Sequence, residues 1–292
     1  MLRINNKSLA IACASGSFKG AFAHGVLSAL ESAGIRANAY AAASSSVVPI
    51  AWAAIGETTN LGVDYWFAGL QLLKKPDIGM SQIVLAGIAH LSPPKERLFA
   101  PETPSYFIAT SAVISESAAN ETQTEKARRL GRRLLVSAGK RDRSWVDEHL
   151  QVALFSTSNP KGELHLNASN FEEVAYASSR MLHGWNIPAW IDGKPFIDAS
   201  YTCLCPAIAM VEAGYQEVIA IANEPGTLYQ DMFQLEPIPE IYKGARIHII
   251  RPDVDPKEYE VNFTDATEAG LIGIYQHGKQ KGNEFIEHLT LE

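Results

Sequence analysis

The sequence predicts an α/β protein with a central, mostly parallel sheet flanked by helices. Twice near the N-terminus, a short apolar run is followed by a turn of small residues and then by a segment with helical apolar spacing. Strand, turn and helix repeated in this order are typical of α/β proteins, whose parallel strands are buried on both faces. Hydrophobic residues make up 47% of the 292 residues, which is enough for the large core of such a fold.

The first unit begins with an apolar run at residues 9–14, which has the length and composition of a buried parallel strand. A helix is predicted at residues 21–33, because apolar side chains such as Phe22 and Val26 recur there at helical spacing. Gly34 stands where a helix of this length would end.

The second unit repeats this order. A strand is predicted at residues 37–43 and a helix at residues 47–55. Pro49 is compatible with this helix because it lies in the first turn, where its missing N–H would have no helical partner. Gly56 is the expected end of the helix.

The rest of the chain is expected to add elements to the same sheet. Segment 92–94, Ser-Pro-Pro, is expected to break the chain. Further helices are predicted at residues 61–73, 81–91, 121–136 and 207–213, and further strands at residues 107–110, 151–155, 217–221 and 246–250. Because there is no internal repeat and no low-complexity linker, we predict a single domain over residues 1–292, with an apolar, helical, cap-like segment around residues 61–100.

Charge and cysteine content exclude several classes of protein. Asp and Glu total 32 against 25 Lys and Arg, a formal charge of -7, which disfavours a general nucleic-acid binder. The three cysteines, Cys13, Cys203 and Cys205, give no disulfide framework. The Cys203-x-Cys205 pair lacks the second pair of a zinc site. We therefore expect no metal ion and no cofactor.

The sequence also predicts a cytoplasmic protein. Residues 1–7 lack the apolar region and cleavage site of a signal peptide. The longest apolar stretch, residues 37–55, is interrupted by three serines and by Pro49, so it is a poor candidate for a membrane-spanning helix.

The turn Ala42-Ala43-Ser44-Ser45-Ser46 lies between the second strand and its helix. A sharp turn in this position can expose a serine hydroxyl as a nucleophile if the residues two before and two after it are small. Ser44 meets this condition, whereas Ser45 and Ser46 would each place a valine at the second position. We therefore predict Ser44 as the nucleophile. Taken alone, the turn is better explained by close packing or helix capping.

Two other segments favour the catalytic interpretation. The loop Ser15-Gly16-Ser17-Phe18-Lys19-Gly20 follows the first strand and opens its helix, where backbone N–H groups bind anions. Its spacing fits neither a P-loop nor a dinucleotide fingerprint. Downstream, Asp198 follows Phe196-Ile197, and apolar surroundings raise the proton affinity of a carboxylate towards that of a base. Asp192-Gly193 is interpreted as the two-residue turn of a hairpin.

In this order the three segments resemble the motifs of patatin-like acyl hydrolases, which are Gly-Gly-Gly-x-Arg/Lys-Gly, Gly-x-Ser-x-Gly and Asp-Gly-Gly/Ala. The resemblance covers most of the chain and implies a three-layer αβα fold. Ser or Ala replaces several of the motif glycines here. The residues that the resemblance assigns to the site are Ser44 and Asp198 as a catalytic dyad, Gly16 and Ser17 as oxyanion-hole donors, and Ser15, Lys19 and Gly20 as the supporting loop.

The resemblance implies a serine hydrolase of the lipase or phospholipase A type. Its expected partner is a lipid or acyl-ester substrate, with peripheral contact to a membrane surface and no nucleic acid. The apolar segments after the serine predict a preference for medium or long acyl chains over acetate. The arginines at positions 128, 129, 132 and 133 are interpreted as a solvated helix face, with lipid headgroup contact as the alternative.

Two alternative functions stay open. The replaced glycines are also compatible with a patatin-like protein that has lost catalysis and serves as a binding or scaffold module. A Ser-His-Asp esterase is the second alternative, and His277 is the best placed of the eight histidines for that role.

Overall fold

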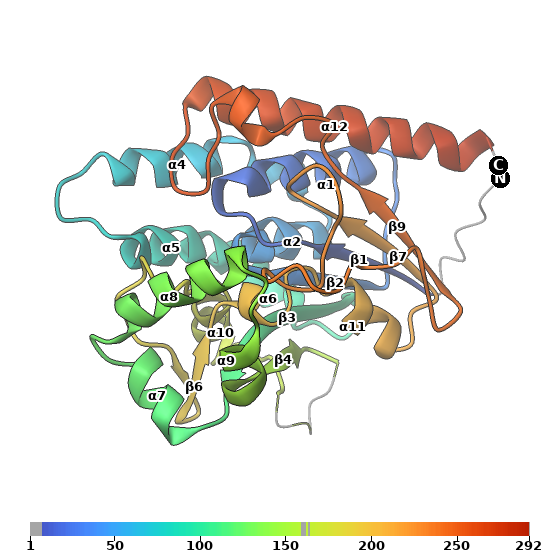
Figure 1. Cartoon of the computed structure of the whole chain (residues 1–292). Coiled ribbons are helices and arrows are strands. Elements are labelled where there is room, and N and C mark those ends of the chain that lie inside the picture. Colours follow the sequence, from blue (N-terminus) through green and yellow to red (C-terminus); the bar gives the residue numbers. More distant parts are fainter. Residues whose placement is uncertain (1–7, 159–161, 163, 292) are drawn as a thin grey trace.

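The computed structural model of the chain describes residues 8–158, 162 and 164–291. Helices lie on both faces of a central sheet (Figure 1), which confirms the predicted α/β class with its mostly parallel sheet. Residues 1–7, on which the absence of a signal peptide was predicted, lie outside the described residues. Within the described chain, no helix combines the length and the apolar content needed to cross a membrane.

The sheet is built around five parallel strands. These are β1 (Leu9–Cys13), β2 (Ala39–Ala43), β3 (Ser105–Val113), β7 (Glu217–Ile221) and β9 (Ala245–Ile250). Antiparallel partners extend it, namely β4 (Leu150–Ser156), β5 (Trp190–Ile191), β6 (Lys194–Ile197) and β8 (Ile241–Tyr242). In the described residues the nine-stranded sheet has the order β5-β6-β3-β2-β1-β7-β9-β8, and β4 pairs with β3 off this path.

All of the predicted strands are present, and so is the predicted hairpin. Trp190 pairs with Pro195 and Ile191 with Lys194, which leaves Asp192 and Gly193 as a two-residue turn. Both turn residues have a positive φ, 49° and 73°, as the tight turns of two-residue hairpins require.

The alternation of side chains along β1 shows how the two faces are filled. Leu9, Ile11 and Cys13 contribute to the larger core, on the side of helices α1 (Ala21–Ser32), α2 (Val47–Ala54) and α10 (Phe171–Ser178). Ala10 and Ala12 face a second core, formed with helix α11 (Ala207–Glu212). Helices therefore cover both faces, and the small alanine side chains let α11 lie close to the sheet.

The remaining helices complete the outer layers. Helix α12 (Glu268–Leu291) lies along α1 (Figure 1). The others are α3 (Thr58–Leu61), α4 (Asp64–Leu73), α5 (Met80–Ile88), α6 (Ser92–Leu98), α7 (Glu116–Thr122), α8 (Ala127–Gly139) and α9 (Ser144–His149), with the 3-10 segments η1 (Ser17–Gly20), η2 (Ser44–Ser46), η3 (Ala89–Leu91), η4 (Ala199–Tyr201) and η5 (Pro256–Tyr259).

Three expectations about the helices are corrected. Segment 92–94 does not break the chain but opens α6, because prolines in the first turn remove only N–H groups that have no helical partner. The helix predicted at residues 61–73 is divided into α3 and α4 at Gly62, which has a φ of +66°. The helix predicted at residues 121–136 is two helices, α7 and α8.

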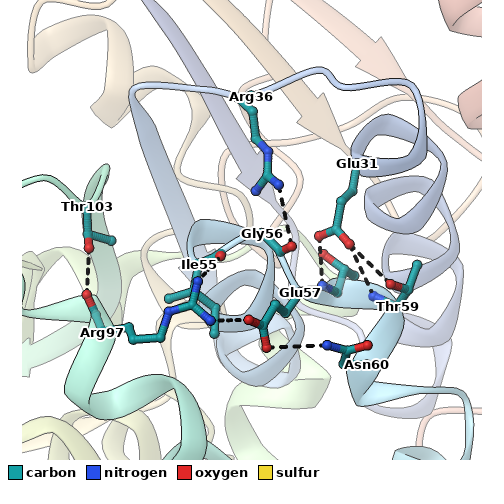
Figure 2. A network of polar contacts seen from close by, with 10 residues as sticks. Glu31, Arg36, Ile55, Gly56, Glu57, Thr59, Asn60, Arg97 and Thr103 are labelled. Carbon is teal, nitrogen blue, oxygen red and sulfur yellow. Dashed lines mark hydrogen bonds and ion pairs between the residues drawn. The ribbon is translucent and has the colours of Figure 1, made fainter.

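Polar contacts hold together the two ends of the cap-like segment (Figure 2). Arg97, in α6, forms an ion pair with Glu57, just before α3, and donates a hydrogen bond of 2.9 Å to the Ile55 carbonyl. Glu31, at the end of α1, accepts a hydrogen bond of 2.7 Å from the Thr58 N–H and so caps α3. These contacts join α1 and α6 to the short segment that connects α2 with α3.

Candidate active site

Strands β2 and β6 end opposite each other on the same edge of β3, because β4 pairs with residues 107–113 of β3 along its other edge. Strand β2 runs parallel to β3 and its last pair joins Ala43 to Ala109, whereas β6 runs antiparallel and its last pair joins Ile197 to Ser111. Only Thr110 separates these two pairings on β3. Since Ser44 directly follows β2 and Asp198 directly follows β6, the two approaching strands deliver these side chains to the same place.

The Ser44 hydroxyl donates a hydrogen bond of 3.0 Å to Oδ2 of Asp198. Ser44 is 6% exposed and Asp198 is fully buried. Among the described residues, the Ser44 hydroxyl is bonded to Asp198 and the Ser44 N–H to Ser178, and neither group is bonded to a histidine. A serine and a carboxylate base are thus within the distance that direct proton transfer requires.

The backbone at Ser44 has the sharp turn predicted for a nucleophile. Its φ is +55°, a conformation that costs a residue other than glycine of order 1–3 kcal/mol. Two side chains hold this turn in place. Ser178 accepts a hydrogen bond of 2.8 Å from the Ser44 N–H, and Ser46 accepts one of 3.0 Å from the Ala43 N–H. Strain that the surroundings maintain in this way is typical of functional positions.

Asp198 is buried and held by its neighbours. Its Oδ1 accepts a hydrogen bond of 2.7 Å from the Ser200 N–H, and its carbonyl accepts one of 2.7 Å from the Ser111 hydroxyl. Burial raises the pKa of Asp198 from 3.8 to about 6, against the opposing effect of hydrogen bonds from Ser200 and Ser44. A carboxylate with this pKa is ionised at neutral pH and is a stronger base than an exposed aspartate.

The loop at Ser15–Ser17 supplies unpaired backbone donors. Gly16 is buried, and Ser17 begins η1 with a φ of +50°. Within the described residues, neither the Gly16 nor the Ser17 N–H has a hydrogen-bond acceptor. Because buried N–H groups are rarely left without a partner, these two are suited to receive a ligand oxygen.

Asn223, which follows β7, holds this loop in place and was not predicted from the sequence. Its Nδ2 donates to the Ala14 carbonyl at 2.7 Å, and its Oδ1 accepts a hydrogen bond of 3.3 Å from the Ala23 N–H. A Cβ added at Gly16 would lie 2.9 Å from the Asn223 Cβ. Any side chain at position 16 would collide with Asn223, so this position requires glycine.

The predicted supporting residues surround the dyad without touching its reacting atoms. Ser15 accepts a hydrogen bond of 2.7 Å from the Ser200 hydroxyl, which joins the loop to the aspartate turn. Lys19 forms an ion pair with Glu224. A Cβ at Gly20 would lie 2.9 Å from the Trp66 ring and 3.1 Å from the Ser45 hydroxyl, so this glycine allows the loop to pack against the serine turn.

An apolar cavity of ≈ 200 Å³ opens beside Ser44, and Ser17 also lines it. This volume is more than ten times the roughly 10–15 Å³ that one water molecule needs. Helices α4 and α5 of the predicted cap-like segment form much of the wall, through residues that include Trp66, Ala68, Leu72, Met80, Ile83 and Val84.

His24 orients one wall of this cavity and was not assigned a role from the sequence. Its Nδ1 accepts a hydrogen bond of 3.1 Å from the indole N–H of Trp66, and its Nε2 lies 3.2 Å from the Thr58 carbonyl. Burial lowers the pKa of His24 to about 4. The neutral ring therefore acts as a positioning group for Trp66.

The histidine of the triad alternative lies elsewhere. Nε2 of His277 accepts a hydrogen bond of 3.2 Å from the Asp253 N–H, and its ring contacts Phe22 and Tyr259. His90 lines the apolar cavity but is not hydrogen-bonded to Ser44. The described residues also contain no group of three or more His, Cys, Asp or Glu side chains that could hold a metal ion.

Replacement of Gly16 by valine is expected to lower kcat for an acyl ester at least about 10²-fold. The new side chain would overlap Asn223 and displace the loop, and the loss of one oxyanion donor costs this much. Gly139→Val is the control, because a Cβ there meets nothing within 4 Å. Circular dichroism verifies folding. Unchanged turnover in a folded Gly16→Val protein would show that the loop has only a structural role.

No protein-family model matches the sequence, and no curated protein matches it either. The function must therefore be inferred from the residues and their geometry.

Proposed function

We propose that the protein is a serine acyl hydrolase of the patatin-like type that cleaves lipid acyl esters. The main support is the hydrogen bond from the Ser44 hydroxyl to a fully buried Asp198, beside an apolar cavity. In this proposal the enzyme works in the cytoplasm, in peripheral contact with a lipid surface.

The proposed reaction has two steps. Ser44 Oγ attacks the ester carbonyl while its proton passes to Oδ2 of Asp198, and the resulting oxyanion accepts hydrogen bonds from the Gly16 and Ser17 N–H groups. Collapse of this intermediate breaks the ester bond, and the proton on Asp198 passes to the departing alcohol. A water molecule then gives a proton to Asp198 and attacks the acyl-enzyme carbonyl. When this second intermediate collapses, the bond between the acyl group and Ser44 Oγ breaks, Asp198 returns the proton to Ser44 Oγ, and the fatty acid is released.

The apolar cavity is proposed to hold the acyl chain. Each buried methylene contributes about 0.8 kcal/mol, or about fourfold in affinity. We therefore expect kcat/KM in a series of p-nitrophenyl esters to rise from acetate towards medium-length chains, until the cavity is filled. Highest efficiency with acetate would show that the cavity does not hold the chain.

A variant that narrows the cavity locates the acyl chain. Val84 lines the cavity from α5, and the neighbouring Leu85 is 42% exposed and does not line it. Val84→Trp is expected to move the optimum to shorter chains, whereas Leu85→Trp is expected to leave it in place. If both variants prefer the same acyl-chain length, the acyl chain binds in another part of the molecule.

The observation that favours a non-catalytic binding module is the replacement of motif glycines by serine or alanine, as at Ser17 and Ala42. Labelling with a fluorophosphonate probe separates the two functions, because only an activated serine reacts. We expect labelling of Ser44. Folded protein that is neither labelled nor able to hydrolyse any ester of the series would support the binding module.

A further inference from the structure

Helix α8 and the residues at its two ends carry a dense group of positive charges. Residues 126–141 contain seven basic side chains and no acidic one, and all seven are exposed, at positions 126, 128, 129, 132, 133, 140 and 141. Since the whole chain has a formal net charge of -7 and this segment has +7, the rest of the chain carries -14. The exposed side of residues 126–141, here called the basic face, is therefore a local feature of an acidic protein.

Three of the four arginines of α8 have no counter-ion among the described residues. Arg133 forms an ion pair with Glu121 at 3.0 Å, whereas the side chains of Arg128, Arg129 and Arg132 form none. Arg128 and Arg132 stand four residues apart, and so do Arg129 and Arg133. Like charges at this spacing destabilise a helix, so an anionic partner would relieve their repulsion.

Two exposed apolar side chains lie among these charges. Val136 is 59% exposed and Leu135 is 39% exposed. Arg132 and Arg133 precede Val136 by four and three residues, and Lys140 follows it by four, so all three are its neighbours on the helix surface. Water gives these apolar atoms no stabilisation, whereas an apolar partner would bury them favourably.

The opposite side of α8 fixes the helix to the body of the protein. Leu130 and Leu134 belong to the larger core, and a Cβ added at Gly131 would overlap the backbone of His183. Figure 1 shows α8 on the outside of the molecule, well apart from α12. The basic face is therefore already formed in the folded protein and needs no folding step to bind a partner.

The basic face lies close to the loop that precedes η1. Leu135 lines a cavity of ≈ 700 Å³ together with Ser15 and Gly16 of that loop. A surface that contacts α8 would therefore lie beside a cavity that extends to the proposed oxyanion donors.

We propose that the basic face of α8 docks the protein on an anionic lipid surface, with the arginines at the headgroups and Val136 in the apolar boundary beneath them. Anionic lipid surfaces attract clusters of Lys and Arg, and apolar side chains beside such a cluster add to the binding by their burial. A nucleic acid would match the charges but offers no apolar phase for Val136. The inference rests on the proposed acyl hydrolase function, whose ester the docked surface would contain.

The first test measures binding of Ser44→Ala protein, which lacks the proposed nucleophile, to phosphatidylcholine vesicles with and without phosphatidylglycerol. Binding is expected only with phosphatidylglycerol, and added salt should weaken it. Arg128→Gln/Arg132→Gln is expected to weaken binding at least about tenfold, because each basic residue near such a surface contributes about fivefold. Arg246→Gln/Lys257→Gln removes the same charge from exposed positions on β9 and η5 and is expected to leave binding unchanged. Equal effects of the two double variants would overturn docking through α8.

The second test locates the contact. The cysteines Cys13, Cys203 and Cys205 are buried, so a thiol introduced at an exposed position can be labelled selectively with a polarity-sensitive fluorophore. The emission of a label on Val136→Cys is expected to shift to shorter wavelength when phosphatidylglycerol vesicles are added. Ile272→Cys is the control, since Ile272 is 43% exposed on α12, and its label should not respond. Absence of a shift at position 136 in protein that binds the vesicles would overturn the proposal.

Duplex DNA separates a lipid surface from another polyanion. We expect the protein to bind the anionic vesicles more tightly than the DNA. DNA binding that is at least as tight and equally dependent on Arg128 and Arg132 would overturn the lipid surface and assign the basic face to a nucleic acid.

Docking and hydrolysis fail in different ways. Hydrolysis of soluble p-nitrophenyl esters by protein that does not bind the anionic vesicles would overturn the docking and leave the acyl hydrolase intact. Vesicle binding that depends on Arg128 and Arg132, in a protein whose wild type hydrolyses no ester, would overturn the hydrolase and retain the docking face.

Discussion

Replacement of Ser44 by alanine is expected to lower kcat/KM for acyl esters by at least about 10⁴-fold, because loss of a nucleophile leaves only the contribution of binding and the oxyanion hole. The change removes one hydrogen bond to Asp198 and leaves the Ser44 backbone contact with Ser178. Thermal unfolding should therefore stay cooperative. The measurement is steady-state hydrolysis of a medium-chain p-nitrophenyl ester beside an unfolding curve.

Ser45→Ala is the matched control for this prediction. Ser45 lines the same cavity, and its hydroxyl is buried and has no hydrogen-bond partner among the described residues. Its removal abolishes no bond and is expected to be neutral or slightly stabilising. If Ser45→Ala inactivates the enzyme and Ser44→Ala does not, the nucleophile has been assigned to the wrong serine.

Replacement of Asp198 by asparagine is expected to lower kcat about 10⁴-fold, because an amide cannot accept the Ser44 proton. The same change should stabilise the fold at neutral pH. Burial raises the pKa of this carboxyl from 3.8 to about 6, so the folded protein binds its proton more tightly than the unfolded chain does. Above pH 6 the folded state must therefore hold an ionised carboxylate that burial disfavours.

The pH dependence of stability follows from this difference. As the pH rises from about 4 to about 6, the wild-type protein is expected to lose roughly 3 kcal/mol of unfolding free energy at this position. Asp198→Asn avoids that loss. Urea unfolding should therefore show the variant to be more stable near neutral pH and no more stable than wild type below about pH 4. Lower stability of the variant at neutral pH would contradict the proposed strain at Asp198.

Activity should depend on pH through the same group. Because the base must be ionised, wild-type kcat/KM is expected to fall as the pH drops through about 6. A profile that stays flat well below this value would assign the base to another residue.

Local sequence patterns were sufficient to predict the two strand–turn–helix units near the N-terminus. The apolar runs at β1 and β2, the small residues at Ser44 and the stop at Gly56 all act within a few neighbouring positions. Segment 92–94 was interpreted wrongly because proline marks both a chain break and the first turn of a helix. Whether the two prolines end an element or open a helix depends on how the residues after them pack against the rest of the protein.

The supporting residues gave no sequence signal. Ser178 stands in the sequence Ala-Ser-Ser-Arg and Asn223 in Ala-Asn-Glu-Pro, and nothing in their spacing relates them to Ser44 or Gly16. Their roles depend on contacts across long sequence separations. Ser44 N–H reaches Ser178 over 134 positions, and Asn223 reaches the Ala14 carbonyl over 209.

The sequence by itself determined the α/β class and the small-residue turn at Ser44, because side-chain size and apolar spacing act locally. Only the tertiary structure decided that Ser44 and Asp198, 154 positions apart, meet at β3, since β2 and β6 reach the same edge of that strand from opposite directions. It also decided the raised pKa of Asp198 and the apolar cavity beside Ser44. Burial and the shape of a cavity depend on what the rest of the chain places around a residue.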